Sequence, residues 1–125
     1  MIKVTAAIIE ENGQILIARR KPGARMGRKW EFPGGKVEPG EEPEQALARE
    51  LEEELAISAR VGRLLGRTMF EVDGVSFELL AYRAERVAGE PVCKEHEEIR
   101  WVEPRELPSY DLAESDRRIA RDIFG

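Results

Sequence analysis

One uninterrupted stretch of helix-forming residues, from Pro43 to Leu55, constrains the fold of this chain most strongly. The turns Gly34-Gly35 and Pro39-Gly40 precede it, and no breaker falls inside it. Pro43 can occupy the first turn of a helix, where its missing N–H costs little. Ala, Leu, Glu and Gln dominate the stretch and have high helix propensity. The sequence therefore predicts a helix over residues 43–55.

The remaining regular segments are mostly predicted strands. Asn12-Gly13 and Asp73-Gly74 are typical hairpin turns between apolar, β-branched runs. A second helix is predicted over residues 111–124. Because strands outnumber helices and most connections resemble hairpins, we expect an α+β fold, a mixed β-sheet sandwiched between helices. The predicted strands cover residues 3–10, 14–19, 30–32, 61–73, 75–85 and 99–102.

Size and composition limit the classes of protein. The chain has 125 residues, of which 42% are hydrophobic and 36% charged, so we expect a single domain over residues 1–125. No apolar run approaches the roughly 20 residues that span a bilayer, and the N-terminal segment resembles a strand more than a signal peptide. Cys93 is the only cysteine, which fits a cytoplasmic protein with no internal disulfide. A monomer or a homodimer is expected, with no membrane partner.

The charge distribution favours a small anionic ligand over a nucleic-acid polymer. A formal net charge of -5 lacks the basic footprint of a general nucleic-acid binder. Basic residues nevertheless cluster just before the acidic helix, and a site that holds a metal ion and a phosphate would use both signs of charge. The clustered residues are Arg19, Arg20, Lys21, Arg25, Arg28, Lys29 and Lys36.

The acids of the predicted helix are not spread evenly around it. At 100° per residue, the buried stripe consists of Leu47, Leu51 and Leu55. Measured from Leu47, Glu50, Glu53 and Glu54 fall at about 300°, 240° and 340°, on one flank of that stripe. Glu52 falls near 140°, on the other side. Three carboxylates are therefore expected to converge beside the core.

This convergence has two interpretations. Like charges at these spacings destabilise a helix by a few tenths of a kcal/mol per pair, and partial burial increases the penalty. A divalent cation would remove it, and oxygen ligands favour Mg²⁺, Mn²⁺ or Ca²⁺ over zinc. The second interpretation is a solvated helix face held by salt bridges, in which Arg49 pairs with Glu53, Glu52 or Glu41.

The segment resembles the signature of the Nudix hydrolases, especially the small MutT-type members. The match extends over nearly the whole chain, including the lead-in Trp30 to Gly35 and the C-terminal helix. One position departs, because Ala56 stands where the signature has glycine, and we expect a less clean end to the helix. The signature positions present are Gly35, Glu41, Arg49, Glu50, Leu51, Glu53, Glu54 and Ile57.

The resemblance implies hydrolysis of a phosphoanhydride in a nucleotide, with Mg²⁺ (or else Mn²⁺) as cofactor. It implies that Glu50, Glu53 and Glu54 bind the metal, together with a backbone carbonyl of Gly34 or Gly35. Arg49 would orient these carboxylates, with Glu41 as its structural partner. A further acid outside the signature, Glu95 with Glu98 as second choice, would complete the site as ligand or base. The implied catalytic set is Arg49, Glu50, Glu53 and Glu95.

Substrate contacts are also implied by the resemblance. Arg20 and Lys36 would touch phosphates, or else carry ordinary surface charge. Asp116 would read the edge of the base, or else be an acid or cap at the helix N-terminus. The apolar wall would come from Phe32, Phe70 and Phe77.

The expected reaction converts a nucleoside triphosphate into a monophosphate and pyrophosphate. Oxidised dGTP is the first expected substrate, and CTP or modified dCTP the second. Two further possibilities are ADP-ribose or a dinucleoside polyphosphate as substrate, and a nucleotide-binding module without turnover. His96 is interpreted as a loop residue, Cys93 as a packing residue and Trp30 as part of the core.

Overall fold

The computed structural model describes residues 1–24 and 27–125, so the predicted basic residue Arg25 lies outside the described part. The helices of this part are α1 (Pro43–Leu55), the 3-10 helix η1 (Pro104–Ser109) and α2 (Glu114–Phe124). The strands are β1 (Ile2–Ile8), β2 (Glu10–Glu11), β3 (Gln14–Arg19), β4 (Trp30–Glu31), β5 (Ser58–Val72), β6 (Val75–Ala88) and β7 (Glu98–Val102). None of the described helices is long and apolar enough to cross a membrane.

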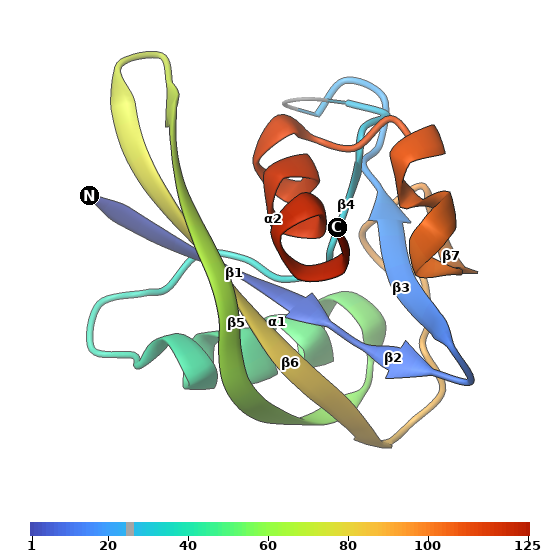
Figure 1. Ribbon diagram of the computed structural model, residues 1–125. Coiled ribbons are helices and arrows are strands. Elements are labelled where there is room, and N and C mark those ends of the chain that lie inside the picture. Colours follow the sequence, from blue (N-terminus) through green and yellow to red (C-terminus); the bar gives the residue numbers. More distant parts are fainter. Residues whose placement is uncertain (25–26) are drawn as a thin grey trace.

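The strands form two sheets, and the pairing is mixed. In the first, with order β1-β6-β5, β1 is parallel to β6 while β5 is antiparallel to it. In the second, β3 pairs with β2, β4 and β7, all antiparallel. Figure 1 shows α2 between the β5–β6 hairpin and β3, with α1 behind the first sheet.

Residues of β1 alternate between two hydrophobic cores, which places helices on both faces of the sheet. Ala6 and Ile8 pack in the core that contains Ile119 of α2. Ala7, with Ile9 just beyond the strand, packs in the core of α1. This period-2 alternation is the reason why the strand is buried on both sides. The expected α+β arrangement, a mixed sheet between helices, is confirmed.

The predicted bounds of helices and strands agree best with the structure where turn residues and helix-forming residues in the local sequence determine them. The bounds of α1 and β3 agree with the predictions, whereas the first predicted strand is split at Ile9 and both long hairpin strands extend further. Cys93 is exposed, so its interpretation as a packing residue is wrong.

The helix predicted from residue 111 begins only at Glu114, and η1 was not expected. Residues 111–113 pair instead with β4. The Trp30 amide donates to the Asp111 carbonyl at 2.9 Å, and the Ala113 amide donates to the Trp30 carbonyl at 2.9 Å. A tertiary contact therefore overrides local helix propensity here.

Helix α1 ends cleanly despite the missing glycine, contrary to the expectation. Ala56 adopts the left-handed conformation (φ 58°, ψ 32°), and its amide donates to the Glu52 carbonyl at 3.0 Å. A non-glycine residue pays roughly 1–2 kcal/mol for this conformation. The chain thus keeps the geometry of a glycine stop with a strained alanine.

We predict that Ala56→Gly stabilises the protein by about 1 kcal/mol, or about 3–5 °C in Tm, because it removes this strain. The matched control is Ala48→Gly inside α1, which should lower stability by about 1 kcal/mol. Thermal unfolding monitored by circular dichroism measures both. A drop in Tm for Ala56→Gly comparable to that of the control would contradict the strain.

Candidate active site

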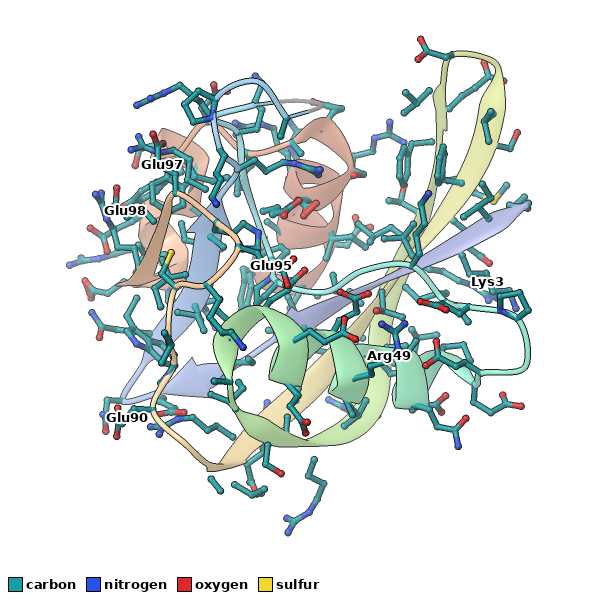
Figure 2. All side chains as sticks on the ribbon, turned by 180° about the vertical axis from the view of Figure 1, so that it is seen from behind. Lys3, Arg49, Glu90, Glu95, Glu97 and Glu98 are labelled. Atoms are coloured by element: carbon teal, nitrogen blue, oxygen red, sulfur yellow. The ribbon has the colours of Figure 1, made fainter. Side chains whose placement is uncertain are left out.

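A cavity of about 540 Å³ brings together most of the residues implied by the resemblance. Its walls come from β1, the segment after β3, β4 and the segment that follows it, α1, the β5–β6 hairpin, the loop between β6 and β7, and the start of α2. Figure 2 shows Glu95 near the centre of the molecule and Glu98 near its edge. The expected residues in the lining are Arg20, Phe32, Gly34, Gly35, Lys36, Glu50, Glu54, Phe70, Phe77, Glu95 and Asp116.

The two glycines of the lead-in allow contacts that no side chain would permit. Thr5 donates from its amide and its hydroxyl to the Gly35 carbonyl, at 2.8 and 2.9 Å. A Cβ on Gly34 would lie 2.1 Å from the Thr5 carbonyl oxygen. A Cβ on Gly35 would lie 2.4 Å from Cδ of Glu50. Gly34 therefore lets the loop approach β1, while Gly35 leaves room for a carboxylate of α1.

Arg49 joins the helix to the lead-in loop. Its guanidinium donates to both oxygens of Glu41, at 2.7 and 2.9 Å, so the expected pairing is present. It also donates to Glu50 at 3.0 Å, to Glu53 at 3.2 Å and to the Lys36 carbonyl at 3.1 Å. The Arg49 hydrogen bonds lower the pKa of Glu41 to about 2. One cation thus offsets part of the negative charge of three glutamates.

Glu54 is the buried carboxylate of the site. Its side chain accepts a hydrogen bond from the Gly34 amide at 3.3 Å, and the residue is 8% exposed. Burial, together with the charges of Glu31, Glu50 and Glu95, raises its pKa to about 9, while the hydrogen bond from the Gly34 amide acts in the opposite direction. Burial also raises the pKa of Glu50, although Arg49 opposes this shift. A bound cation would offset this repulsion, so the donor set fits a divalent metal.

Glu53 does not converge with Glu50 and Glu54 beside the core, contrary to the prediction. Its side chain is 52% exposed, pairs with Arg49 and is not part of the cavity lining. Among the described residues, no three His, Cys, Asp or Glu side chains form a preassembled metal cluster. The carboxylates of Glu50 and Glu53 are turned toward Arg49, while Glu54 is turned toward Gly34. An ion shared by all three would require these side chains to reorient.

Asp116 also lines the cavity, from the start of α2. It accepts the Phe32 amide at 3.2 Å, and burial together with the charge of Glu31 holds its pKa well above its ordinary value. It is an acid in the first turn of α2 but not the cap, because Ala113 is the N-cap residue. Phe70 and Phe77 belong to the same lining and stack on each other, with ring centroids 5.0 Å apart.

The lining also contains polar residues that sequence reasoning did not identify, among them Thr5, Glu31 and His96. Glu31 accepts hydrogen bonds from Arg20 at 3.2 Å and pairs with His96 Nε2 at 2.8 Å. The available signal was a lone acid between the buried aromatic residues Trp30 and Phe32. His96 is a loop residue as expected, but it is buried.

We predict opposite consequences for the two glycines of the lead-in. Gly35→Ala displaces the Glu50 carboxylate, a flexible group, so turnover should fall at least tenfold while Tm changes by only a few degrees. Gly34→Ala meets the backbone of β1, so it should lower Tm strongly, by about 2 kcal/mol or more in stability. Steady-state kinetics and thermal unfolding separate the two. Equal Tm losses in both variants would contradict the assignment.

We predict that Glu54→Gln stabilises the protein at pH 8 in EDTA. Because the folded-state pKa lies above the ordinary value, the buried carboxyl favours folding below about pH 4.5, and this contribution is lost as the pH rises toward 9. The introduced glutamine keeps an acceptor for the Gly34 amide without the charge. The gain should be about 2–4 kcal/mol at pH 8 and vanish near pH 5.

Denaturant unfolding across pH measures this difference, with the exposed Glu52→Gln as the matched control. A difference independent of pH would show that the carboxyl does not titrate as described.

Comparison with known proteins agrees with this geometry. The model of the NUDIX domain matches residues 1–123. The chain is 44% identical over 116 residues to a CTP pyrophosphohydrolase of Escherichia coli, covering 93% of this chain and 86% of that protein. It is also 44% identical over 125 residues to an 8-oxo-dGTP diphosphatase of Haemophilus influenzae, covering 99% and 92%. The solution structure of the E. coli ORF135 protein superposes with a TM-score of 0.86 at 41% identity, covering 98% of this chain and 87% of that one. The chain belongs to the Nudix hydrolase family.

Proposed function

We propose that this protein hydrolyses a nucleoside triphosphate to a nucleoside monophosphate and pyrophosphate, with Mg²⁺ as cofactor and oxidised dGTP as first substrate. One observation carries the proposal. A single cavity is lined by the carboxylates of Glu50, Glu54 and Glu95, by Asp116 and by apolar side chains that include Phe70 and Phe77. The carboxylates suit a metal ion with phosphates, and the apolar side chains beside a buried carboxyl suit a base.

Glu50, Glu54 and Glu95 would hold the cation. The Gly34 carbonyl is the better backbone ligand, because the Gly35 carbonyl already accepts two hydrogen bonds from Thr5. Mg²⁺ suits such a site, since it binds a few carboxylates and completes its shell with waters and phosphates. A cation held there supplies charge neutralisation of the phosphates and a more acidic water.

The remaining residues bind and orient. Arg20 and Lys36 would hold phosphate oxygens from the rim of the cavity. Arg49 keeps Glu50 directed toward Gly35 by its hydrogen bond. Glu95 lines the cavity and is exposed, so it would either hold the cation or accept the proton of the attacking water. Glu53 would have to turn away from Arg49 to accept that proton.

The Asp116 carboxyl supports two candidate substrates. A neutral carboxyl at Asp116 offers a donor and an acceptor side by side. Oxidised guanine presents a matching N7–H and O6, and cytosine presents its N4 amino group and N3. The relative from E. coli named for CTP favours cytidine nucleotides as the second candidate. The cytoplasmic location and the monomeric or homodimeric state stay predictions from the sequence.

A nucleotide panel with and without Mg²⁺, scored for pyrophosphate against phosphate release, tests the proposal. It contains the common NTPs and dNTPs, oxidised dGTP, methylated dCTP, ADP-ribose and a diadenosine polyphosphate. We expect Mg²⁺-dependent pyrophosphate release, greatest from oxidised dGTP. Turnover of only ADP-ribose or the dinucleotide would contradict the substrate class, and binding without turnover would support a non-catalytic module.

The matched variants for this assay lie on α1. Glu54→Gln should abolish most turnover while the fold persists, since it removes a buried ligand. Glu52→Gln should change turnover less than threefold, because Glu52 is exposed and outside the cavity. Activity of Glu54→Gln within a few-fold of wild type would exclude Glu54 as a metal ligand.

A further inference from the structure

We propose that His96 is a positioning residue. Its hydrogen bond to Glu31 limits Glu31 to a single hydrogen bond with Arg20, so that Arg20 can also bind substrate phosphates. The inference rests on the proposed function, since it concerns a phosphate contact of the same cavity. His96, Glu31 and Arg20 all line that cavity, but they come from the β6–β7 loop, β4 and the end of β3.

The hydrogen-bond pattern determines what His96 can do. Its side chain is 7% exposed, and Nε2 lies 2.8 Å from Oε2 of Glu31. A carboxylate only accepts, so Nε2 carries the hydrogen in this bond. Nδ1 is buried without a hydrogen-bond partner among the described residues. A hydrogen on Nδ1 would create an unpaired buried donor, so the tautomer with its hydrogen on Nε2 is favoured.

Glu31 is thereby shared between two donors. Its Oε1 accepts one hydrogen bond from Nη1 of Arg20 at 3.2 Å, while His96 occupies Oε2. A carboxylate that is free to turn can pair with arginine through two parallel bonds. The bond to His96 fixes the Glu31 carboxylate in an orientation in which Arg20 reaches Oε1 alone, so the remaining N–H groups of Arg20 can bind a phosphate.

The backbone of the loop is anchored without the His96 side chain. The amides of Val92 and Lys94 donate to the carbonyls of Leu55 and Glu54, at 2.8 and 3.4 Å. On the other side of His96, the Glu97 amide donates to the Arg19 carbonyl at 2.9 Å. Loss of the imidazole donor should therefore act through Glu31 and leave the loop in place.

The test compares His96→Met with His96→Gln, two side chains of similar length and volume. Gln retains an N–H donor near the position of Nε2, whereas Met has none. We expect His96→Met to raise KM for the triphosphate about tenfold, with kcat within threefold of wild type and Tm within about 3 °C. His96→Gln should have a KM close to that of wild type.

A double-mutant cycle with Glu31→Gln tests whether His96 acts on KM through Glu31. A glutamine has one oxygen acceptor and cannot take Arg20 through two oxygens, so His96→Met should have little further effect on KM in that background. A His96→Met effect that persists there would overturn the inference. Equal KM values for His96→Met and His96→Gln, or a fall in kcat with KM unchanged, would also overturn it.

Binding of inorganic pyrophosphate, measured by calorimetry, keeps this test separate from the proposed function. The expected order of affinity is wild type, His96→Gln, then His96→Met, with a gap of about fivefold or more between the last two. If no triphosphate were hydrolysed, the proposed function would fail. The pyrophosphate affinities would still support the role of His96 by this order, or overturn it by equal values.

Discussion

The burial of carboxylates in a small core is the constraint to which the rest of this structure responds. Glu54 and Asp116 are both largely removed from water, and Glu31 adds its charge to the environment of each. Burial of an ionised carboxyl costs several kcal/mol unless donors or cations surround it. The amides of Gly34 and Phe32 supply such donors. The buried carboxylates thus lower the stability of the folded chain and at the same time provide a site that favours a cation.

On the solvent side of the cavity, Arg49 offsets part of the negative charge of the glutamates. Its guanidinium donates hydrogen bonds to three glutamates and a backbone carbonyl, so it fixes the helix against the loop as well as offsetting charge. The exposure of Glu53 follows from its place on the helix. At about 240° from Leu47 it lies roughly 160° from the middle of the stripe formed by Leu47, Leu51 and Leu55, farther from the core than Glu50 or Glu54. Its side chain therefore lies in solvent, where it pairs with Arg49.

The features predicted correctly from the sequence are those that depend on residues close together in the chain. Helix α1 had helix-forming residues and turns near it, and the Arg49–Glu41 pair falls within one motif, so both could be identified. The start of α2 was wrong because residues 111–113 pair with Trp30, far away in the chain. The Glu31–His96 pair was missed for the same reason, since 65 positions separate its members. Neither residue belongs to a periodic pattern that would have predicted the contact.

The division of the cavity between elements also explains why the reaction is easier to predict than the base. Two of the three proposed metal-binding carboxylates, Glu50 and Glu54, come from α1, which forms one contiguous motif with its glycine lead-in. The residues proposed to contact the base come from the β5–β6 hairpin and the start of α2, and these meet only in the folded chain. Phe70 and Phe77 contact each other across paired strands, and neither is among the hydrogen-bond partners of Arg49. Substitutions on the hairpin can therefore change the shape offered to a base while the hydrogen bonds of Arg49 remain. The contiguous motif thus determines the chemistry, and base selection depends on residues that no single motif contains.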